Sequence, residues 1–513
     1  MNDWTQGYVS DIEYLPGFYA EQTPAHLDAV CMLRGVEPPV AQGQPFTYCE
    51  LGCGVAETAL VIAAANPKSH VWGFDFNPAH IARARALAVA GKVGNIQLEE
   101  ASFEELNAGK VNDLPSFDYI ALHGVWSWVS LENRQHIVRF IDRYLKPGGM
   151  VYVTYNALPG WASVIPLQRM LLMFSGVGHD RSDRRVVQSL ERALQFADAG
   201  AVGLSEEMLK GLKKERDNAN VAYLSHEYLN EHWAPCYQMD VARDLSGAKL
   251  SFVGTANLLE NFPDLSLSGE QRDLLAQLPP ALSETARDYF LQRTFRRDIY
   301  MRGARPIPER RLDHRISEKR LSLVVPPLAI TRTVKIPRGE ATLNEGFYTP
   351  AFEALTEKPH TIGELRDLPH AAAKSASPRE VLGMMVGTRQ AMLMPNSISE
   401  EALAGVRAFN LAHLAACADE GRAVCALAAA ATGSAVTVRL IEMLAYEVLV
   451  TGTAPDIEAL TDAMWALLEK RGDRLRQEGE LIQDAEENRR ILRENAEVIL
   501  AGALPLWQRI GAI

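Results

Sequence analysis

Residues 45–54 read PFTYCELGCG, an apolar run that leads directly into two glycines. A strand that ends in Gly52 and Gly54 before a helix is typical of a turn where the backbone approaches a ligand, because glycine has no Cβ. The helix is predicted within VAETALVIAAANP, which stops at Asn66 and Pro67. This stretch therefore predicts a strand–turn–helix unit with a ligand site at its turn.

Four more strand-like runs follow, with helical segments between them. They lie within HVWGFDFNP (70–78), NIQLEE (95–100), FDYIALHG (117–124) and MVYVTYN (150–156). Strands that alternate with helices form a parallel, doubly wound α/β sheet. Ligands bind such a sheet beyond the carboxyl ends of its strands, where the strand order reverses.

Composition limits the classes of function. The chain has 513 residues, enough for several domains, and its net charge of −12 argues against a nucleic-acid binder. Its six cysteines form no C-x-x-C pair, so we expect neither a disulfide framework nor a metal site. The N-terminus lacks the features of a signal peptide. The most apolar run, 423–438, is shorter than the roughly 20 residues of a membrane span, and we expect a buried helix there. These features predict a cytoplasmic protein without stable membrane insertion.

The pattern along the chain predicts four regions: an N-terminal lid segment (1–45), the α/β domain (46–161), a helical middle domain (162–320) and a C-terminal domain (321–513). Amphipathic helices broken by glycines dominate the middle domain. Near 349–396 the C-terminal domain has a helix–turn–helix–strand pattern typical of a winged helix. Because that region has few basic residues, we expect it to dock protein rather than DNA.

The residues around the glycine turn limit which ligand could bind there. A dinucleotide site prefers G-x-G-x-x-G, but Glu57 occupies the place of the third glycine. Asp75 ends the second predicted strand, where it suits two ribose hydroxyls, and Glu50 would repel a pyrophosphate but tolerate a cation. S-adenosylmethionine has a ribose, a sulfonium and an ammonium and no phosphate, so it fits best. NAD and a turn without a ligand are the alternatives.

With these motifs the chain resembles class I S-adenosylmethionine-dependent methyltransferases, since ELGCG is similar to their first motif and GFDFNP to their ribose-binding segment. HGVWSWVS (123–130), PGGMVYVTYNALPGW (147–161), HEYLN (226–230) and FRRDIYMRG (295–303) together resemble the bacterial group that carries a methyltransferase regulatory domain. That group includes protein lysine methyltransferases that act on outer-membrane proteins. The resemblance implies a Rossmann-like methyltransferase sheet, a protein substrate such as an envelope or surface protein, and a homodimer.

The cofactor is expected to contact the ends of the first four predicted strands. Ser102 and Phe103 stand where the family often has an acidic residue for the adenine amine. We expect Ser102 to accept that hydrogen bond and Phe103 to cover the ring. The predicted cofactor-binding residues are Glu50, Gly52, Gly54, Asp75, Phe76, Ser102, Phe103, His123 and Gly124.

The fourth predicted strand ends in His-Gly-Val-Trp-Ser-Trp, not in the Asn-Pro-Pro-Tyr pattern used for planar amines. Aromatic faces attract a cationic amine, and burial lowers the pKa of a lysine ammonium. The predicted catalytic residues are His123, Trp126, Tyr155 and Asn156, with Trp126 as a wall of the lysine channel. The other predicted channel residues are Tyr14, Tyr19, Trp128, Tyr223 and His226. Core packing of a tryptophan, a structural His123, and a turn-shaping role for Tyr155 and Asn156 are the alternatives.

The sequence therefore predicts an S-adenosylmethionine-dependent methyltransferase that acts on a protein side chain, lysine first. A small-molecule N- or O-methyltransferase, in which the accessory domains close a pocket, is the alternative. A non-catalytic interaction protein with a vestigial cofactor site is the third, and the intact Gly52, Gly54 and Asp75 argue against it. The lone His-Glu pair at 226–227 has no second histidine at helical spacing, so it predicts no metal.

Overall fold

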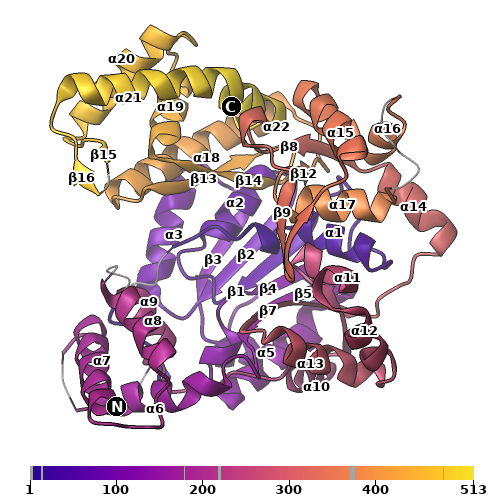
Figure 1. Ribbon diagram of the computed structural model, residues 1–513, viewed down its shortest axis with the longest axis vertical. Coiled ribbons are helices and arrows are strands. Elements are labelled where there is room, and N and C mark those ends of the chain that lie inside the picture. The colour runs from indigo at the N-terminus through magenta and orange to yellow at the C-terminus, as the bar shows by residue number, and fades with distance from the viewer. Residues whose placement is uncertain (1–3, 13–15, 178–179, 218–220, 370–375, 478) are drawn as a thin grey trace.

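A seven-stranded sheet lies at the centre of the molecule (Figure 1). The computed structural model describes residues 4–12, 16–177, 180–217, 221–369, 376–477 and 479–513. The strand order is β3-β2-β1-β4-β5-β7-β6. The strands are β1 Thr47–Leu51, β2 His70–Asp75, β3 Ile96–Glu100, β4 Phe117–Leu122, β5 Leu145–Asn156, β6 Leu250–Thr255 and β7 Phe295–Arg302.

The first five strands are parallel, and helices connect them as predicted. The connecting helices are α2 Glu57–Ala65, α3 Pro78–Ala90, α4 Phe103–Ala108 and α5 Leu131–Tyr144. Asn77, Ser102 and Ser130 cap three of them by accepting a backbone N–H, which is why α3, α4 and α5 begin where they do. The strand order reverses between β1 and β4, so a ligand is expected at the carboxyl ends of these two strands.

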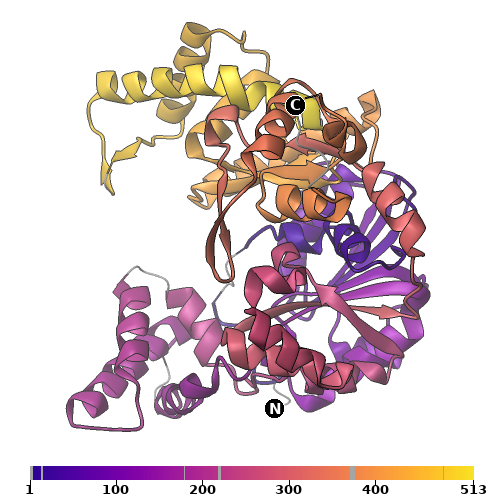
Figure 2. The ribbon, with the colours of Figure 1, turned by 45° about the vertical axis from the view of Figure 1, so that its right-hand side comes forward.

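The last two strands of the sheet come from beyond the predicted α/β domain. β7 runs antiparallel along β5, from the pair Met150–Met301 to the pair Asn156–Phe295, and β6 pairs with β7. The sheet therefore continues past the predicted boundary at residue 161. Between β5 and β7 the chain forms helices on one side of the sheet (Figures 1 and 2). They include α6 Ile165–Ser175, α7 Ser182–Asp198, α8 Glu206–Asp217, α9 Val221–Tyr228, α10 Gln238–Ser246 and α13 Pro280–Leu291.

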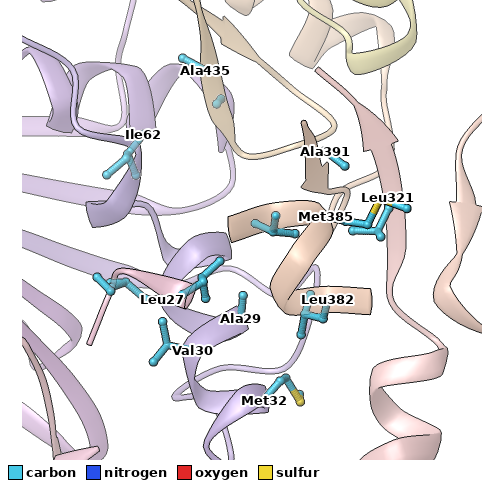
Figure 3. Close-up of a cluster of buried hydrophobic side chains, with 14 of the residues drawn as sticks. Leu27, Ala29, Val30, Met32, Ile62, Leu321, Leu382, Met385, Ala391 and Ala435 are labelled. Atoms are coloured by element: carbon cyan, nitrogen blue, oxygen red, sulfur yellow. The ribbon is translucent and has the colours of Figure 1, made fainter. Parts of the chain in front are cut away.

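The C-terminal region shares a core with the α/β domain. Figure 3 shows Leu27 and Val30 of α1 (Pro24–Leu33) beside Leu382 and Met385 of α17 (Pro378–Gly387), and all four belong to one buried cluster. The strands β11 (His360–Thr361), β8 (Arg320–Leu323) and β12 (Ala391–Leu393) form an antiparallel sheet next to α15 (Glu345–Glu357), α16 (Ile362–Arg366) and α17. The winged-helix assignment of this region stays a prediction.

The apolar run at 423–438 is not the helix that we expected. It forms an antiparallel hairpin of β13 (Val424–Ala429) and β14 (Ser434–Arg439), with Gly433 in the left-handed region at φ +61°. A turn residue that readily adopts positive φ interrupts the alanine-rich run, so the chain reverses there. The hairpin packs on α18 (Glu400–Asp419) and α2. After it come α19 Leu440–Val450, α20 Ile457–Lys470, α21 Ala485–Val498 and α22 Leu504–Ile510.

Candidate active site

A cavity opens at the carboxyl ends of β1, β2 and β4, at the reversal of strand order. The first turns of α4 and α5 and the N-terminal segment 4–12 also contribute to its lining. Eight of the nine predicted cofactor-binding residues line this cavity: Gly52, Gly54, Asp75, Phe76, Ser102, Phe103, His123 and Gly124. The strand–turn–helix units of the sheet thus bring together residues that are spread over about 70 positions of the sequence.

Glycine is required at both positions of the glycine turn, but for different reasons. Gly52 and Gly54 both have positive φ, at +69° and +55°. A Cβ at Gly52 would lie 2.6 Å from Cγ2 of Val125, whereas a Cβ at Gly54 would meet nothing within 4 Å. Position 52 therefore excludes a side chain by space and by conformation, and position 54 by conformation alone.

Asp75 is held rigidly at the edge of the cavity. Its Oδ2 accepts the backbone N–H of Gly54 at 2.9 Å, and its Oδ1 accepts that of Asn77 at 2.9 Å and lies 3.2 Å from Nδ1 of His80. A carboxylate has about four lone-pair sites, so one remains for a ligand hydroxyl. Asp75 therefore both closes the glycine turn and offers an acceptor to a ribose.

Ser102 and Phe103 lie at the start of α4. The Ser102 hydroxyl accepts the N–H of Glu105 at 3.2 Å and donates to the Glu105 carboxylate at 3.1 Å. This capping role leaves one lone pair of Ser102 for an adenine amine. The Phe103 ring extends over the glycine turn, with Cζ 3.9 Å from the position of a Cβ at Gly52.

Glu50 lies behind the turn and does not line the cavity. It is 5% exposed, and burial raises its pKa to about 8. Its Oε2 has no hydrogen-bond partner among the described residues. An ammonium group that donates to this atom would satisfy it and favour its ionised form, so this acceptor suits the ammonium of S-adenosylmethionine.

The N-terminal segment covers the cavity, and the sequence did not predict which of its residues do so. Trp4 and Tyr8 contact Phe76, with ring centroids 5.7 and 5.9 Å apart. Asn133 donates a hydrogen bond of 2.6 Å to the Gln6 side chain, which ties the segment to α5. Tyr14, a predicted lid residue, lies outside the described residues.

Tyr19, like Tyr14 a predicted channel residue of the N-terminal region, stacks on His123 with ring centroids 3.8 Å apart. Nδ1 of His123 lies 3.1 Å from the Tyr152 hydroxyl. Burial and the nearby Arg297 lower the pKa of His123 to about 3. The imidazole is therefore neutral at physiological pH, and its contacts give it a positioning role beside the cavity.

The two tryptophans after β4 lie in different environments. Trp126 is 0% exposed and packs in the core below the cavity, with the Arg134 guanidinium 5.7 Å from its ring centroid. Trp128, which is 9% exposed, lines the cavity. Both belong to a 3-10 turn, Trp126–Trp128, in which residues two apart point in different directions. Of the two tryptophans, Trp128 therefore lines the cavity and Trp126 does not, and the channel roles predicted for both stay predictions.

Tyr155 and Asn156, at the end of β5, also lie in different environments. Tyr155 is fully buried and donates a hydrogen bond of 2.6 Å to Asp298, which pairs with Arg296. It belongs to a buried ionic network and does not line the cavity, and its predicted catalytic role stays a prediction. Asn156 instead donates a hydrogen bond of 2.6 Å to Oε1 of Glu227 on α9.

Glu227 was not among the predicted site residues. Its Oε1 also accepts the indole N–H of Trp233 at 3.2 Å, and burial raises its pKa. Burial, and then the charges of Asp75 and Glu227, raise the pKa of Tyr8. Tyr8 lines the cofactor cavity, and its ring lies 5.7 Å from that of His226, the neighbour of Glu227 on α9.

The predicted channel residues Tyr223 and His226 lie on the same helix, α9. The ring of His226 is 5.7 Å from that of Tyr8, and burial and Glu227 raise the pKa of Tyr223. The motif HEYL (226–229) is the feature of the sequence that could have indicated Glu227, but its His-Glu pair was considered only as a metal-binding pair.

The comparisons with known proteins agree with this geometry. Residues 44–183 match a family model described as a methyltransferase domain, and residues 220–302 match one described as a predicted methyltransferase regulatory domain. Over 518 residues the chain is 33% identical to the uncharacterised protein sll1526 of Synechocystis sp., with 99% of each chain covered. The chain belongs to the family of S-adenosylmethionine-dependent methyltransferases with a methyltransferase regulatory domain.

Two further relatives of this methyltransferase come from Rickettsia. The uncharacterised protein RP028 of Rickettsia prowazekii is 27% identical over 226 residues, which cover 43% of this chain and 86% of that protein. The solved structure of PKMT2 from Rickettsia typhi in complex with AdoHcy has a TM-score of 0.66 and 19% identity, and the match covers 98% of this chain and 99% of that chain. The fold is therefore shared along the whole chain, accessory regions included.

We expect two changes at the glycine turn to weaken binding of S-adenosylmethionine to the methyltransferase. Asp75→Ala removes both the ribose acceptor and the partner of Gly54, and it should weaken binding by about 1.5–3 kcal/mol. Gly52→Val should abolish binding because its side chain would overlap Val125. Isothermal titration calorimetry measures both effects. Gly94→Val is the matched control, since a Cβ there meets nothing within 4 Å. Unchanged affinity for S-adenosylmethionine in both Asp75→Ala and Gly52→Val would show that the cofactor does not bind in this cavity.

Alanine substitution should affect mainly stability at Trp126 and mainly cofactor binding at Trp128. Trp126→Ala should lower the free energy of unfolding by about 3–5 kcal/mol, because it leaves a large cavity in the core. Trp128→Ala should lower stability less and weaken cofactor binding more, because the ring faces the site. Urea denaturation and calorimetry on both variants test this assignment. Stronger loss of binding in a folded Trp126→Ala than in Trp128→Ala would contradict it.

Proposed function

We propose that this methyltransferase transfers the methyl group of S-adenosylmethionine to the ε-amino group of a lysine in a protein substrate. The observation that carries the proposal is Glu227, a buried carboxyl group on α9, whose neighbour His226 lies 5.7 Å, ring to ring, from Tyr8 of the cavity lining. A carboxyl group in an aromatic environment suits an acceptor that arrives as a cation and must lose a proton.

The cofactor lies, in this proposal, across the ends of β1, β2 and β4. Asp75 accepts a hydrogen bond from a ribose hydroxyl, Glu50 attracts the ammonium from behind the glycine turn, and Ser102 and Phe103 hold the adenine. Gly52 and Gly54 let the backbone approach the ligand, and His123 and Gly124 bound the site from β4. Trp4 and Tyr8 of the N-terminal segment exclude water from it.

The chemistry requires a neutral amine. A lysine ammonium that enters between Tyr8 and Tyr223 loses solvation, which lowers its pKa. Glu227 accepts the proton, and burial, which raises its pKa, makes it a stronger base than an exposed carboxylate. The lone pair of the amine then attacks the methyl carbon, the carbon–sulfur bond breaks towards sulfur, and the sulfonium becomes a neutral thioether. Alignment of the amine with that bond supplies much of the rate enhancement.

Asn156 and Trp233 position the base. Both donate hydrogen bonds to one oxygen of Glu227, which fixes the carboxyl group relative to the end of β5. Tyr223 and His226 complete the acceptor side from α9. A lysine side chain is long enough to enter such a site while the rest of the substrate protein stays outside.

The resemblance to the group with a methyltransferase regulatory domain, which includes protein lysine methyltransferases, supports a protein acceptor. PKMT2, whose structure was solved in complex with AdoHcy, shares the fold over the full length of this chain. We further propose that the substrate is an envelope or surface protein and that the C-terminal winged-helix-like domain docks it. The enzyme would act in the cytoplasm as a homodimer. None of the helices in the described ranges is long and apolar enough to cross a membrane.

A transfer assay with labelled S-adenosylmethionine and Glu227→Gln tests this function. With whole-cell lysate as acceptor, the wild-type enzyme should label protein bands that yield methyllysine on hydrolysis. Glu227→Gln should lower that rate by about 10²–10⁴-fold at neutral pH, since the amide keeps the contact to Asn156 but accepts no proton. Its affinity for the cofactor should stay nearly unchanged.

The pH dependence separates a base from a structural residue. The wild-type rate should rise with pH as Glu227 ionises through its raised pKa. The deficit of Glu227→Gln should shrink as pH approaches the lysine pKa of about 10.4, where the amine is neutral in solution. Glu231→Gln, at an exposed neighbour, is the matched control. Label confined to small molecules would refute a protein substrate, and equal rates for Glu227→Gln and wild type would refute the base.

A further inference from the structure

Three potential metal ligands meet far from the cofactor cavity. His413 and Cys417 lie one turn apart on α18, and Cys425 lies on the adjacent strand β13. Their side chains are buried, at 1%, 0% and 2% exposed. No C-x-x-C motif marks this cluster in the sequence, because the fold brings the helix and the hairpin together.

The spacing of the three ligand atoms fits a tetrahedral cation. One atom from each residue lies within 4.8 Å of the other two, and Sγ of Cys425 is 3.4 Å from Nδ1 of His413. Zinc bonds of about 2.3 Å to sulfur and 2.0 Å to nitrogen give sulfur–nitrogen separations of roughly 3.5 Å at tetrahedral angles. The side chains therefore need little movement to share one ion.

A carboxylate lies on the other side of the imidazole. Oε1 of Glu57 is 3.3 Å from Nε2 of His413, and Arg422 binds both oxygens of Glu57, at 2.8 and 3.0 Å. A carboxylate behind a ligand histidine is a common arrangement, because it orients the ring and fixes which nitrogen carries the proton. Here it leaves Nδ1 for the metal, which would replace the present contact of Nδ1 with the Ala426 carbonyl at 3.0 Å.

We propose that His413, Cys417 and Cys425 bind one thiophilic divalent cation of the zinc class, with Glu57 orienting His413. Two thiolates and one imidazole are soft ligands, which favour zinc over magnesium or calcium. Clefts on both sides of Glu57 provide a route to the site, one lined by His413 and the other by Cys425.

The position of the cluster gives it a structural role. Glu57 is the first residue of α2, three positions after Gly54 of the glycine turn. A bound ion would therefore connect α18 and β13 of the C-terminal region to the helix that follows the cofactor turn. Metal binding that occurs only in the folded chain stabilises that chain.

Metal content and cobalt spectroscopy on the full-length reduced protein test the site. Elemental analysis after purification should find about one zinc ion per chain. Replacement by Co²⁺ should give thiolate-to-cobalt charge-transfer absorption and intense d–d bands of tetrahedral coordination. Cys417→Ser and Cys425→Ser should each lose most of these bands, whereas Cys236→Ser, at a buried cysteine elsewhere, should keep them. Chelation should lower the melting temperature of wild type and of Cys236→Ser, but not of the two ligand variants.

A reduced, folded wild-type protein that binds neither zinc nor cobalt stoichiometrically would overturn the proposal, even if the ligand variants fail to fold. Detection by mass spectrometry of a Cys417–Cys425 disulfide in place of metal in the reduced preparation would also overturn it. None of these readouts uses methyl transfer, so the result is independent of the proposed enzyme function.

Discussion

The antiparallel pairing of β7 with β5 is the constraint on which the site depends. Strand β5 ends at Asn156, and β7 begins just after Thr294, whose carbonyl accepts the N–H of Ala157 at 2.8 Å. The backbone of Cys236 also bonds to the Asn156 carbonyl at 2.9 Å. Because both ends of the helical insertion are fixed at the carboxyl end of β5, α9 must lie beside the cofactor cavity. The contact between Asn156 and Glu227 is a consequence of this topology.

A buried ionic network specifies that pairing. Arg296 of β7 is fully buried and pairs with Asp298, Asp288 and Glu284, while Tyr155 of β5 donates to Asp298. Burial raises the pKa of Asp288 to about 6, so removal of the arginine would leave carboxyl groups that favour protonation. Such a network adds little net stability over apolar packing, but it strongly disfavours any register that separates its members. This network holds Tyr155, at the end of β5, away from the cavity.

The parts of the site that depend on local pattern could be predicted from the sequence. A strand, two glycines and an acid at the end of the next strand suffice to locate Gly52, Gly54 and Asp75, because parallel strand ends meet at one edge. The direction of a side chain in a 3-10 turn has no such signal, so the sequence did not show which of Trp126 and Trp128, both predicted at the channel, lines the cavity. The roles of Tyr8 and Glu227 depend on contacts between segments about 220 residues apart, such as that of Val9 with Asn230. Neither periodicity nor spacing records such contacts.

The central claim is that the transferable methyl group faces α9 across Tyr8. A crystal structure with sinefungin tests it most directly, because this analogue has an amino group in place of the sulfonium methyl. The account predicts that this amine lies within about 3 Å of the Glu227 carboxylate or the Tyr8 hydroxyl, with the ribose on Asp75. An amine that points away from α9, with the ribose away from Asp75, would contradict the account.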